Sequence, residues 1–288
     1  MKKGRVLVCG LIFLVMILWT FYPLWSYLYK SIFYNSKLLD IGIFGDSYGA
    51  LNTLFSGLAF TGIIVSIYFQ SQELAETRRD INRQTMEFES QTEVLRKQAF
   101  ENTFFQMLTV FRSNSESVYI NEVNDDESID VFTGRKAFRK LLILIRSSFY
   151  RRMGRNKGTP LEVMRKVYIM FDRTYNISVG PYYRTLYQIM KFIDDSSISD
   201  LDKKLYSNIL RAQISSYELS VIFYCGLSIY GDGLFKGYLE KYEFFEHLLF
   251  RTINLGDDNE HIVALIRQYD VQAYGKTNTS ILKCYNSV

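Results

Sequence analysis

The stretch from Ile63 to Thr133 contains neither glycine nor proline. Because these residues are the strongest helix breakers, nothing in the stretch predicts an end to a helix that enters it. The whole chain of 288 residues contains only three prolines, which also favours helices. The second half of the sequence shows no convincing strand alternation. We therefore expect an all-α protein.

Two runs, residues 6–29 and 48–69, contain no charged side chain. Each is long enough to cross the hydrocarbon core of a bilayer as a helix. The first run is too long for a secretory signal peptide, and no small-residue cleavage site follows it. A buried soluble helix is the alternative for the second run, and the neighbouring first run disfavours it. We expect a two-span transmembrane hairpin.

Basic residues lie before the first run and after the second, at Arg78, Arg79 and Arg83, whereas the short loop 30–47 is balanced in charge. The positive-inside rule therefore places both termini in the cytoplasm, in a protein of the cell membrane. The expected organisation is a membrane hairpin (1–70), a helical stalk (71–99) and a cytosolic α-helical domain (100–288).

Small side chains recur every four residues in the second run, at Gly49, Thr53, Gly57 and Thr61. In a helix they form one narrow stripe, which allows another helix to approach closely in lipid. The partner is either the first span or a second copy of the chain. The stripe thus predicts helix packing, with a homo-oligomer as one outcome.

After the second run, apolar residues recur every seven positions. A second series with the same spacing consists mostly of glutamines. Apolar a positions with polar d positions predict a weak coiled-coil seam, in which glutamine specifies the register. The alternative is a single amphipathic helix that packs on its own domain, and both stay open. The a series is Ile67, Leu74, Ile81, Phe88 and Leu95, and the d series is Gln70, Thr77, Gln84, Gln91 and Gln98.

The predicted cytosolic part is a bundle of helices. Residues 113–130 are polar and are expected to form a loop. Pro181 is expected to lie in the first turn of a helix, where proline is tolerated. The helices are predicted at 99–111, 135–153, 161–175, 180–196, about 200–226, 236–252 and 258–269.

Acidic and basic residues are separated on the two sides of residue 130. Residues 116–130 contain six acids and no base, and residues 131–161 contain nine bases and no acid. These neighbours could compensate each other on a solvated surface. The basic segment Arg135–Lys157 could instead meet an anionic lipid surface or a nucleic-acid backbone.

Signatures of catalysis are missing from the sequence. It contains no phosphate loop, nucleophile elbow or zinc-protease motif. Its three cysteines are widely spaced, and His247 and His261 lie on separate predicted helices without metal-ligand spacing. We expect no catalytic residue, no cofactor and no metal. Whether the protein is an enzyme stays open, and the missing motifs favour a protein that is not one.

Four segments resemble, in their order, the putative phage abortive infection protein family, the AbiC-like group, over residues of about 45–250. They read GALNTLFSGLAFTGIIVSIYFQ, QTEVLRKQAFENTFFQML, GPYYRTLYQIMKFIDDS and LYSNILRAQISSYELSVIFYCGLS. The chain departs from the family pattern at Pro181, where a histidine is expected. The resemblance implies bacterial defence, in which an infected cell stops growing or dies before phage mature.

The resemblance singles out residues on two predicted helices. Arg184, Arg211 and Glu218 are expected to meet as a buried ion network that joins these helices. The alternative is a pocket for a phage trigger or a nucleotide-like signal. The matching positions are Gly180, Tyr183, Arg184, Leu186, Tyr187, Arg211, Gln213, Ser216, Tyr217 and Glu218.

Together these features predict a membrane-anchored, non-enzymatic antiphage protein of the bacterial inner membrane. Its cytosolic domain would sense an unknown phage trigger, and its stalk would couple that signal to the spans, which oligomerise and act on the lipid bilayer. A membrane-tethered nucleic-acid-binding or enzymatic toxin is the second hypothesis, and a sensor or scaffold that recruits a partner toxin is the third.

Overall fold

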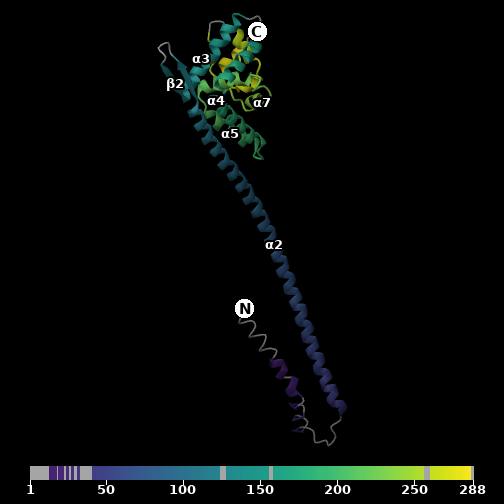
Figure 1. Cartoon of the computed structure of the whole chain (residues 1–288). Helices are drawn as coiled ribbons and strands as arrows, with labels where there is room; N and C mark the ends of the chain where they lie inside the picture. The colour runs from purple at the N-terminus through teal and green to yellow at the C-terminus, as the bar shows by residue number, and fades with distance from the viewer. Residues whose placement is uncertain are drawn as a thin grey trace. The chain divides into compact units, whose positions relative to one another are not determined.

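The computed structural model describes residues 41–123, 128–155, 158–255 and 260–286, together with short helical stretches between 13 and 32. These residues are mostly helical (Figure 1). The chain divides into two compact units, Met1–Glu87 and Phe88–Val288. Parts of the first predicted span, among them residues 6–12, lie outside the described residues.

Helix α2 runs without interruption from Ile41 to Ser117. It contains the uncharged run 48–69 and the whole predicted stalk, so both predicted domain boundaries, at 70 and at 99, lie within one helix. Among the described residues it is the one helix whose length and composition would allow it to cross a membrane, whereas the apolar helix Phe13–Tyr22 is shorter. The two-span hairpin therefore stays a prediction.

A β-hairpin follows α2, where the sequence predicted a loop over 113–130. Strand β1, Tyr119–Val123, pairs antiparallel with β2, Ile129–Thr133, so that Tyr119 faces Thr133. The hydroxyl of Ser178 accepts from the backbone N–H of Tyr119 at 2.8 Å and donates to its carbonyl at 2.7 Å. The polar composition of this segment concealed short strands that contain aromatic and β-branched residues, which favour pairing.

The remaining helices form one aromatic-rich core. Helix α6 lies at its centre, is buried from Glu218 to Gly226, and packs against α3, α4, α7 and α8. The elements are α3 Gly134–Met153, α4 Pro160–Asp195, α5 Asp200–Ala212, α6 Ser216–Gly226, α7 Leu234–Lys241, α8 Phe250–Ile253, α9 Glu260–Ile266, η1 Val271–Tyr274 and α10 Thr279–Asn286. The predicted helix 236–252 is thus interrupted after Lys241.

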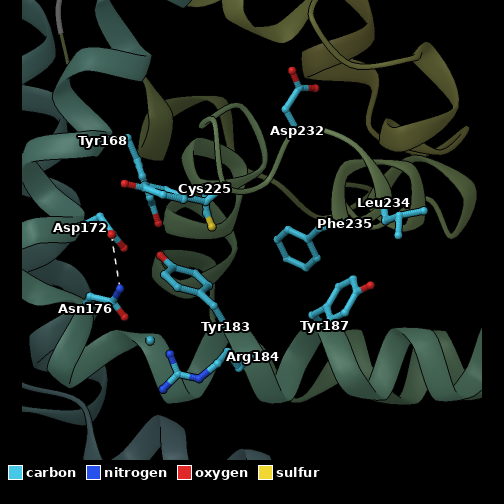
Figure 2. Close-up of a pocket in the computed structure, with 12 residues that line it drawn as sticks. Tyr168, Asp172, Asn176, Tyr183, Arg184, Tyr187, Cys225, Asp232, Leu234 and Phe235 are labelled. Atoms are coloured by element: carbon cyan, nitrogen blue, oxygen red, sulfur yellow. Dashed lines mark hydrogen bonds between the residues drawn. The ribbon is translucent and has the colours of Figure 1, made fainter.

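Helix α4 replaces the two helices predicted at 161–175 and 180–196, and Pro181 lies inside it rather than in a first turn. Proline lacks the N–H that would bond to the carbonyl four residues earlier, which bends a helix. Figure 2 shows α4 turning a corner between Asn176 and Tyr183. Both arms bury apolar residues, such as Val167 and Leu186, so packing keeps the helix continuous.

The single helix predicted over about 200–226 is divided into α5 and α6. Ser215 caps α6, because its side chain accepts from the backbone N–H of Glu218 while the Glu218 carboxylate accepts from that of Ser215. A reciprocal capping box of this kind is formed by a serine followed three residues later by a glutamate, and this pattern is visible in the sequence.

Candidate functional site

A cavity of about 560 Å³ lies in the corner of the bent helix α4 (Figure 2). Its volume is in the range of small-molecule sites in proteins. Both arms of α4 line it, together with the buried helix α6 and the segment that leads into α7. The lining residues are Tyr168, Asp172, Asn176, Gly180, Tyr183, Arg184, Tyr187, Cys225, Tyr230, Asp232, Leu234 and Phe235. We call this cavity the tyrosine pocket.

The floor of the tyrosine pocket consists of two tyrosine hydroxyls and a thiol. The hydroxyl of Tyr183 points towards Tyr168 and Cys225 (Figure 2). Both hydroxyl oxygens are buried, and neither has a hydrogen bond of good geometry to any described residue. Buried polar groups are rarely left without a partner, so these two point to a ligand or to ordered water.

Burial controls the charge of this floor. It raises the pKa of Tyr168 and of Tyr183 well above the ordinary tyrosine value, and neighbouring Cys225 adds to both shifts. Burial likewise raises the pKa of Cys225 to about 12, although the nearby hydroxyl of Tyr168 opposes the shift. All three groups are therefore neutral near pH 7, and Cys225 has little thiolate with which to act as a nucleophile.

The rim of the pocket is polar and includes one unpaired cation. Asn176 donates to the carboxylate of Asp172 at 3.3 Å. The guanidinium of Arg184 turns towards Asn176 across Gly180 (Figure 2). A Cβ at Gly180 would lie 2.1 Å from Asn176 Oδ1 and 2.9 Å from Arg184 Nη1, so glycine is what permits this approach. Among the described residues, no carboxylate pairs with Arg184.

Aromatic rings form the opposite wall. Tyr187 meets Phe235 edge to face, with their ring centroids 6.4 Å apart, and Tyr238 packs behind at 5.9 Å. At the outer edge, Asp232 pairs with Arg165 at 2.5 Å, which anchors the segment before α7 to α4. A pocket with an aromatic wall, neutral donors and one free guanidinium suits a planar ligand with an anionic or hydrogen-bonding group.

Arg184 also lines a second cavity, of about 430 Å³, between α4 and the C-terminal part of α2. Thr103, Met107 and Val110 form the α2 side of this cavity. Beside it, Asn114 of α2 donates to the hydroxyl of Thr185 at 2.7 Å. One side chain therefore lies between the tyrosine pocket and α2.

The predicted ion network among Arg184, Arg211 and Glu218 is wrong. Arg211 is buried and pairs instead with Glu246 at 2.5 Å, and it also donates to the carbonyl of Glu243. Glu218 accepts from the Ser115 hydroxyl at 2.6 Å and from the Ser215 backbone N–H at 2.8 Å. The break between α5 and α6 is the physical reason, because it separates Arg211 from the helix that contains Glu218.

The other predicted residues are dispersed. Tyr187 lines the tyrosine pocket with Arg184, whereas Gln213 ends α5 and Tyr217 borders a different cavity. Tyr183 belongs to the recognised motif, but Tyr168 and Cys225 have no motif that would single them out. The seam residues Leu74, Ile81, Phe88 and Leu95, and with them Gln84, Gln91 and Gln98, are all exposed on α2.

The tyrosine pocket contains the elements of a binding site. No nucleophile next to a base lines it, and the described residues contain no group of three metal-ligating side chains. What this arrangement can do chemically is recognise a ligand by ring packing and hydrogen bonds.

Comparison with known proteins gives one match. No curated protein and no solved structure matches the chain significantly. Residues 174–253 match the model of a family described as putative phage abortive infection protein. This segment contains the second arm of α4 and all of α5, α6, α7 and α8, and thus most of the tyrosine pocket. Over residues 174–253 this match agrees with the resemblance predicted from the sequence: the segment is similar to the family described as putative phage abortive infection protein.

Proposed function

We propose that the protein is a membrane-anchored antiphage defence protein that senses infection in the tyrosine pocket and acts at the bacterial inner membrane. The family match supports the defence role. In such defence the infected cell stops growing or dies before phage mature. The ligand sensed in the pocket would be a small molecule that is made or released during infection.

The surroundings of the uncharged run in α2 support the membrane anchor most directly. No residue from Leu51 to Phe69 is buried, and Leu58 and Phe60 have 59% and 64% of their surface exposed. Apolar surface in water costs about 25 cal/mol per Å², whereas the hydrocarbon core of a bilayer accepts it. A helix with this exposed apolar surface and this length suits a membrane span.

The small-residue stripe supports association within the membrane. The hydroxyls of Thr53 and Thr61 donate to the carbonyls of Gly49 and Gly57 at 2.9 and 2.8 Å, so their polar groups are satisfied within the helix. A Cβ at Gly49 or Gly57 would meet nothing within 4 Å in the described structure. Packing among the described residues thus gives no reason for these glycines, whereas close approach of another helix would.

Helix α2 supplies a route for the signal. At its C-terminal end Phe104, Leu108 and Phe111 are buried in the core that contains the pocket. Arg184 lies between that pocket and α2. A ligand that attracts the guanidinium would alter the α2 contacts, and the same helix contains the uncharged run, so α2 is the element through which such a change would pass.

The experiment compares two glycines of the same run. Gly57→Ile adds a large side chain to the stripe, and Gly62→Ile adds the same side chain outside it. During phage infection, cells with the wild-type protein should lose membrane potential, measured by a voltage-sensitive dye, before they lyse. We expect Gly57→Ile to abolish both depolarisation and protection at unchanged protein level, and Gly62→Ile to retain both.

Full protection by Gly57→Ile would contradict an action that requires packing of the span. Protection by the wild type without any change in membrane potential would contradict action at the membrane. Either outcome would favour a membrane-tethered toxin or a scaffold for a partner toxin. The basic helix α3 is the feature that supports the tethered toxin.

A further inference from the structure

A separate cavity of about 470 Å³ lies between α3, the beginning of α6 and α8. It shares no lining residue with the tyrosine pocket. Three arginines from two elements line it, and no acidic residue does. Its lining consists of Arg139, Leu142, Ile143, Arg146, Ser216, Tyr217, Leu249, Arg251 and Thr252. We call it the arginine cavity.

The three arginines have little compensation. Among the described residues, neither Arg139, Arg146 nor Arg251 forms an ion pair. Arg146 donates through Nη1 to the carbonyl of Thr252 at 2.7 Å, which fixes its guanidinium against α8. Its Nε is buried and has no acceptor in the described structure. Like charges around one cavity repel each other, and a bound anion would remove that cost.

The first turn of α6 adds backbone donors. The capping box uses the amides of Ser215 and Glu218, and the amide of Leu219 donates to the carbonyl of Ser215. Ser216 and Tyr217 line the cavity and are the first two residues of α6, so their amides have no carbonyl partner within the helix. Unpaired amides at the positive end of a helix favour an anion.

We propose that the arginine cavity binds a phosphate group carried by a small organic ligand. Planar guanidinium groups match phosphate oxygens in geometry and form charge-assisted hydrogen bonds with them. The cavity is larger than one phosphate needs, and Leu142, Ile143 and Tyr217 offer apolar and aromatic surface for the rest of the ligand. The inference is independent of the function proposed for the tyrosine pocket.

This site also sharpens the prediction for the basic segment Arg135–Lys157. Its bases do not act as one surface: Lys140 pairs with Glu122, and the guanidinium of Arg152 contacts the sulfur of Met170. Of the described bases in that segment, only Arg139 and Arg146 line the arginine cavity. A concave site with two such bases fits one phosphorylated small molecule better than an extended nucleic-acid backbone.

The test titrates inorganic pyrophosphate against the full chain in phosphatidylcholine nanodiscs by calorimetry. We expect measurable binding that weakens roughly tenfold or more in Arg139→Gln and in Arg251→Gln, because each removes a charge-assisted hydrogen bond. Arg135→Gln, on an exposed residue of the same helix outside the cavity, should leave the affinity unchanged. Circular dichroism should show that all three variants keep the wild-type helix content.

The lipid composition identifies the source of the phosphate. If phosphatidylglycerol in the nanodiscs suppresses pyrophosphate binding, and Arg139→Gln lessens that suppression, the site takes a lipid headgroup. If phosphatidylglycerol has no effect, the ligand is a soluble phosphate compound. Absence of pyrophosphate binding by the wild type would overturn the proposal. An equal loss in Arg135→Gln, or tight binding of single-stranded DNA that depends equally on Arg135 and Arg139, would also overturn it.

Discussion

The two parts of helix α2 have opposite surroundings. From Leu51 to Ala99 none of its residues is buried, whereas Phe100, Phe104, Leu108 and Phe111 are buried further along the same helix. Both parts are rich in apolar side chains, so helix formation alone does not distinguish them. The difference is that the buried residues of the second part find their contacts within the Phe88–Val288 unit, whereas no described residue covers the apolar side chains of the first part.

The largest expected effect comes from removing an aromatic ring in the buried part. Phe104 is fully buried, and its ring centroid lies 5.1 Å from that of Tyr206. Phe104→Ala should lower the free energy of unfolding by about 3–5 kcal/mol, because it leaves a cavity. Denaturant unfolding followed by circular dichroism measures this change.

The matched control is Phe60→Ala in the exposed part, which should change the unfolding free energy of the Phe88–Val288 unit by less than about 0.5 kcal/mol. Equal effects of the two variants would contradict the division of α2 into an exposed and a buried part.

A charge in the exposed part tests whether lipid surrounds it. Leu58→Arg places a cation near the middle of the uncharged run, which costs about 2.5–3.5 kcal/mol at the centre of a membrane helix. We expect a smaller fraction of the protein to remain in the membrane pellet after carbonate extraction. Met86→Arg, at an exposed position of α2 beyond the run, should leave that fraction unchanged; an unchanged fraction for both variants would argue against a span at 48–69.

The buried unit also keeps a charged pair out of water, and this pair predicts a dependence on pH. Hydrogen bonds from Thr277 and the nearby Arg211 lower the pKa of Glu246 in the folded protein, although partial burial opposes the shift. A lowered pKa contributes stability that is present above the unfolded value of about 4.3 and is lost as the pH falls through the folded value.

Glu246→Gln should therefore destabilise the protein by roughly 3 kcal/mol at pH 7, because buried Arg211 loses its anionic partner. The difference from wild type should shrink as the pH falls below the unfolded value of about 4.3 and through the lowered pKa of the folded carboxyl. Unfolding curves at several pH values measure both effects. A difference that stays constant down to pH 3 would show that the charge of Glu246 contributes nothing.

A small effect on stability, joined to a larger effect on protection, is expected for Gly180→Ala. The added Cβ would displace only the ends of the Asn176 and Arg184 side chains, so we expect a change of less than about 1 kcal/mol. Because both side chains belong to the rim of the tyrosine pocket, protection against phage should nevertheless fall. In Gly237→Ala, where the new methyl would meet nothing within 4 Å, protection should persist.

Much of the fold could be predicted from local patterns. The continuity of α2 followed from the absence of glycine and proline after Gly62, and the helix near 135–153 from amphipathic spacing. The β-hairpin after Ser117 was missed because its polar residues resemble those of a loop. The division between α5 and α6 was also missed, although the serine and glutamate of its capping box are visible in the sequence.

The candidate site was less predictable. Arg184 and Tyr187 were recognised through a family motif, but Tyr168 and Cys225 join them only because Pro181 bends a helix instead of starting one. The partner of Arg211 depends on the turn between α5 and α6. The spacing of charged residues along the sequence does not predict this turn. The arginine cavity combines residues of α3, α6 and α8, and its α3 and α8 residues lie more than a hundred positions apart in the sequence.

The sequence by itself determined the long helix, its uncharged run and the resemblance to a defence family, because these depend on residues that are neighbours along the chain. Only the tertiary structure decided which side chains share the tyrosine pocket, which carboxylate pairs with Arg211 and where uncompensated arginines meet. These features depend on how helices bend and pack, and packing is set by the whole core rather than by any local pattern.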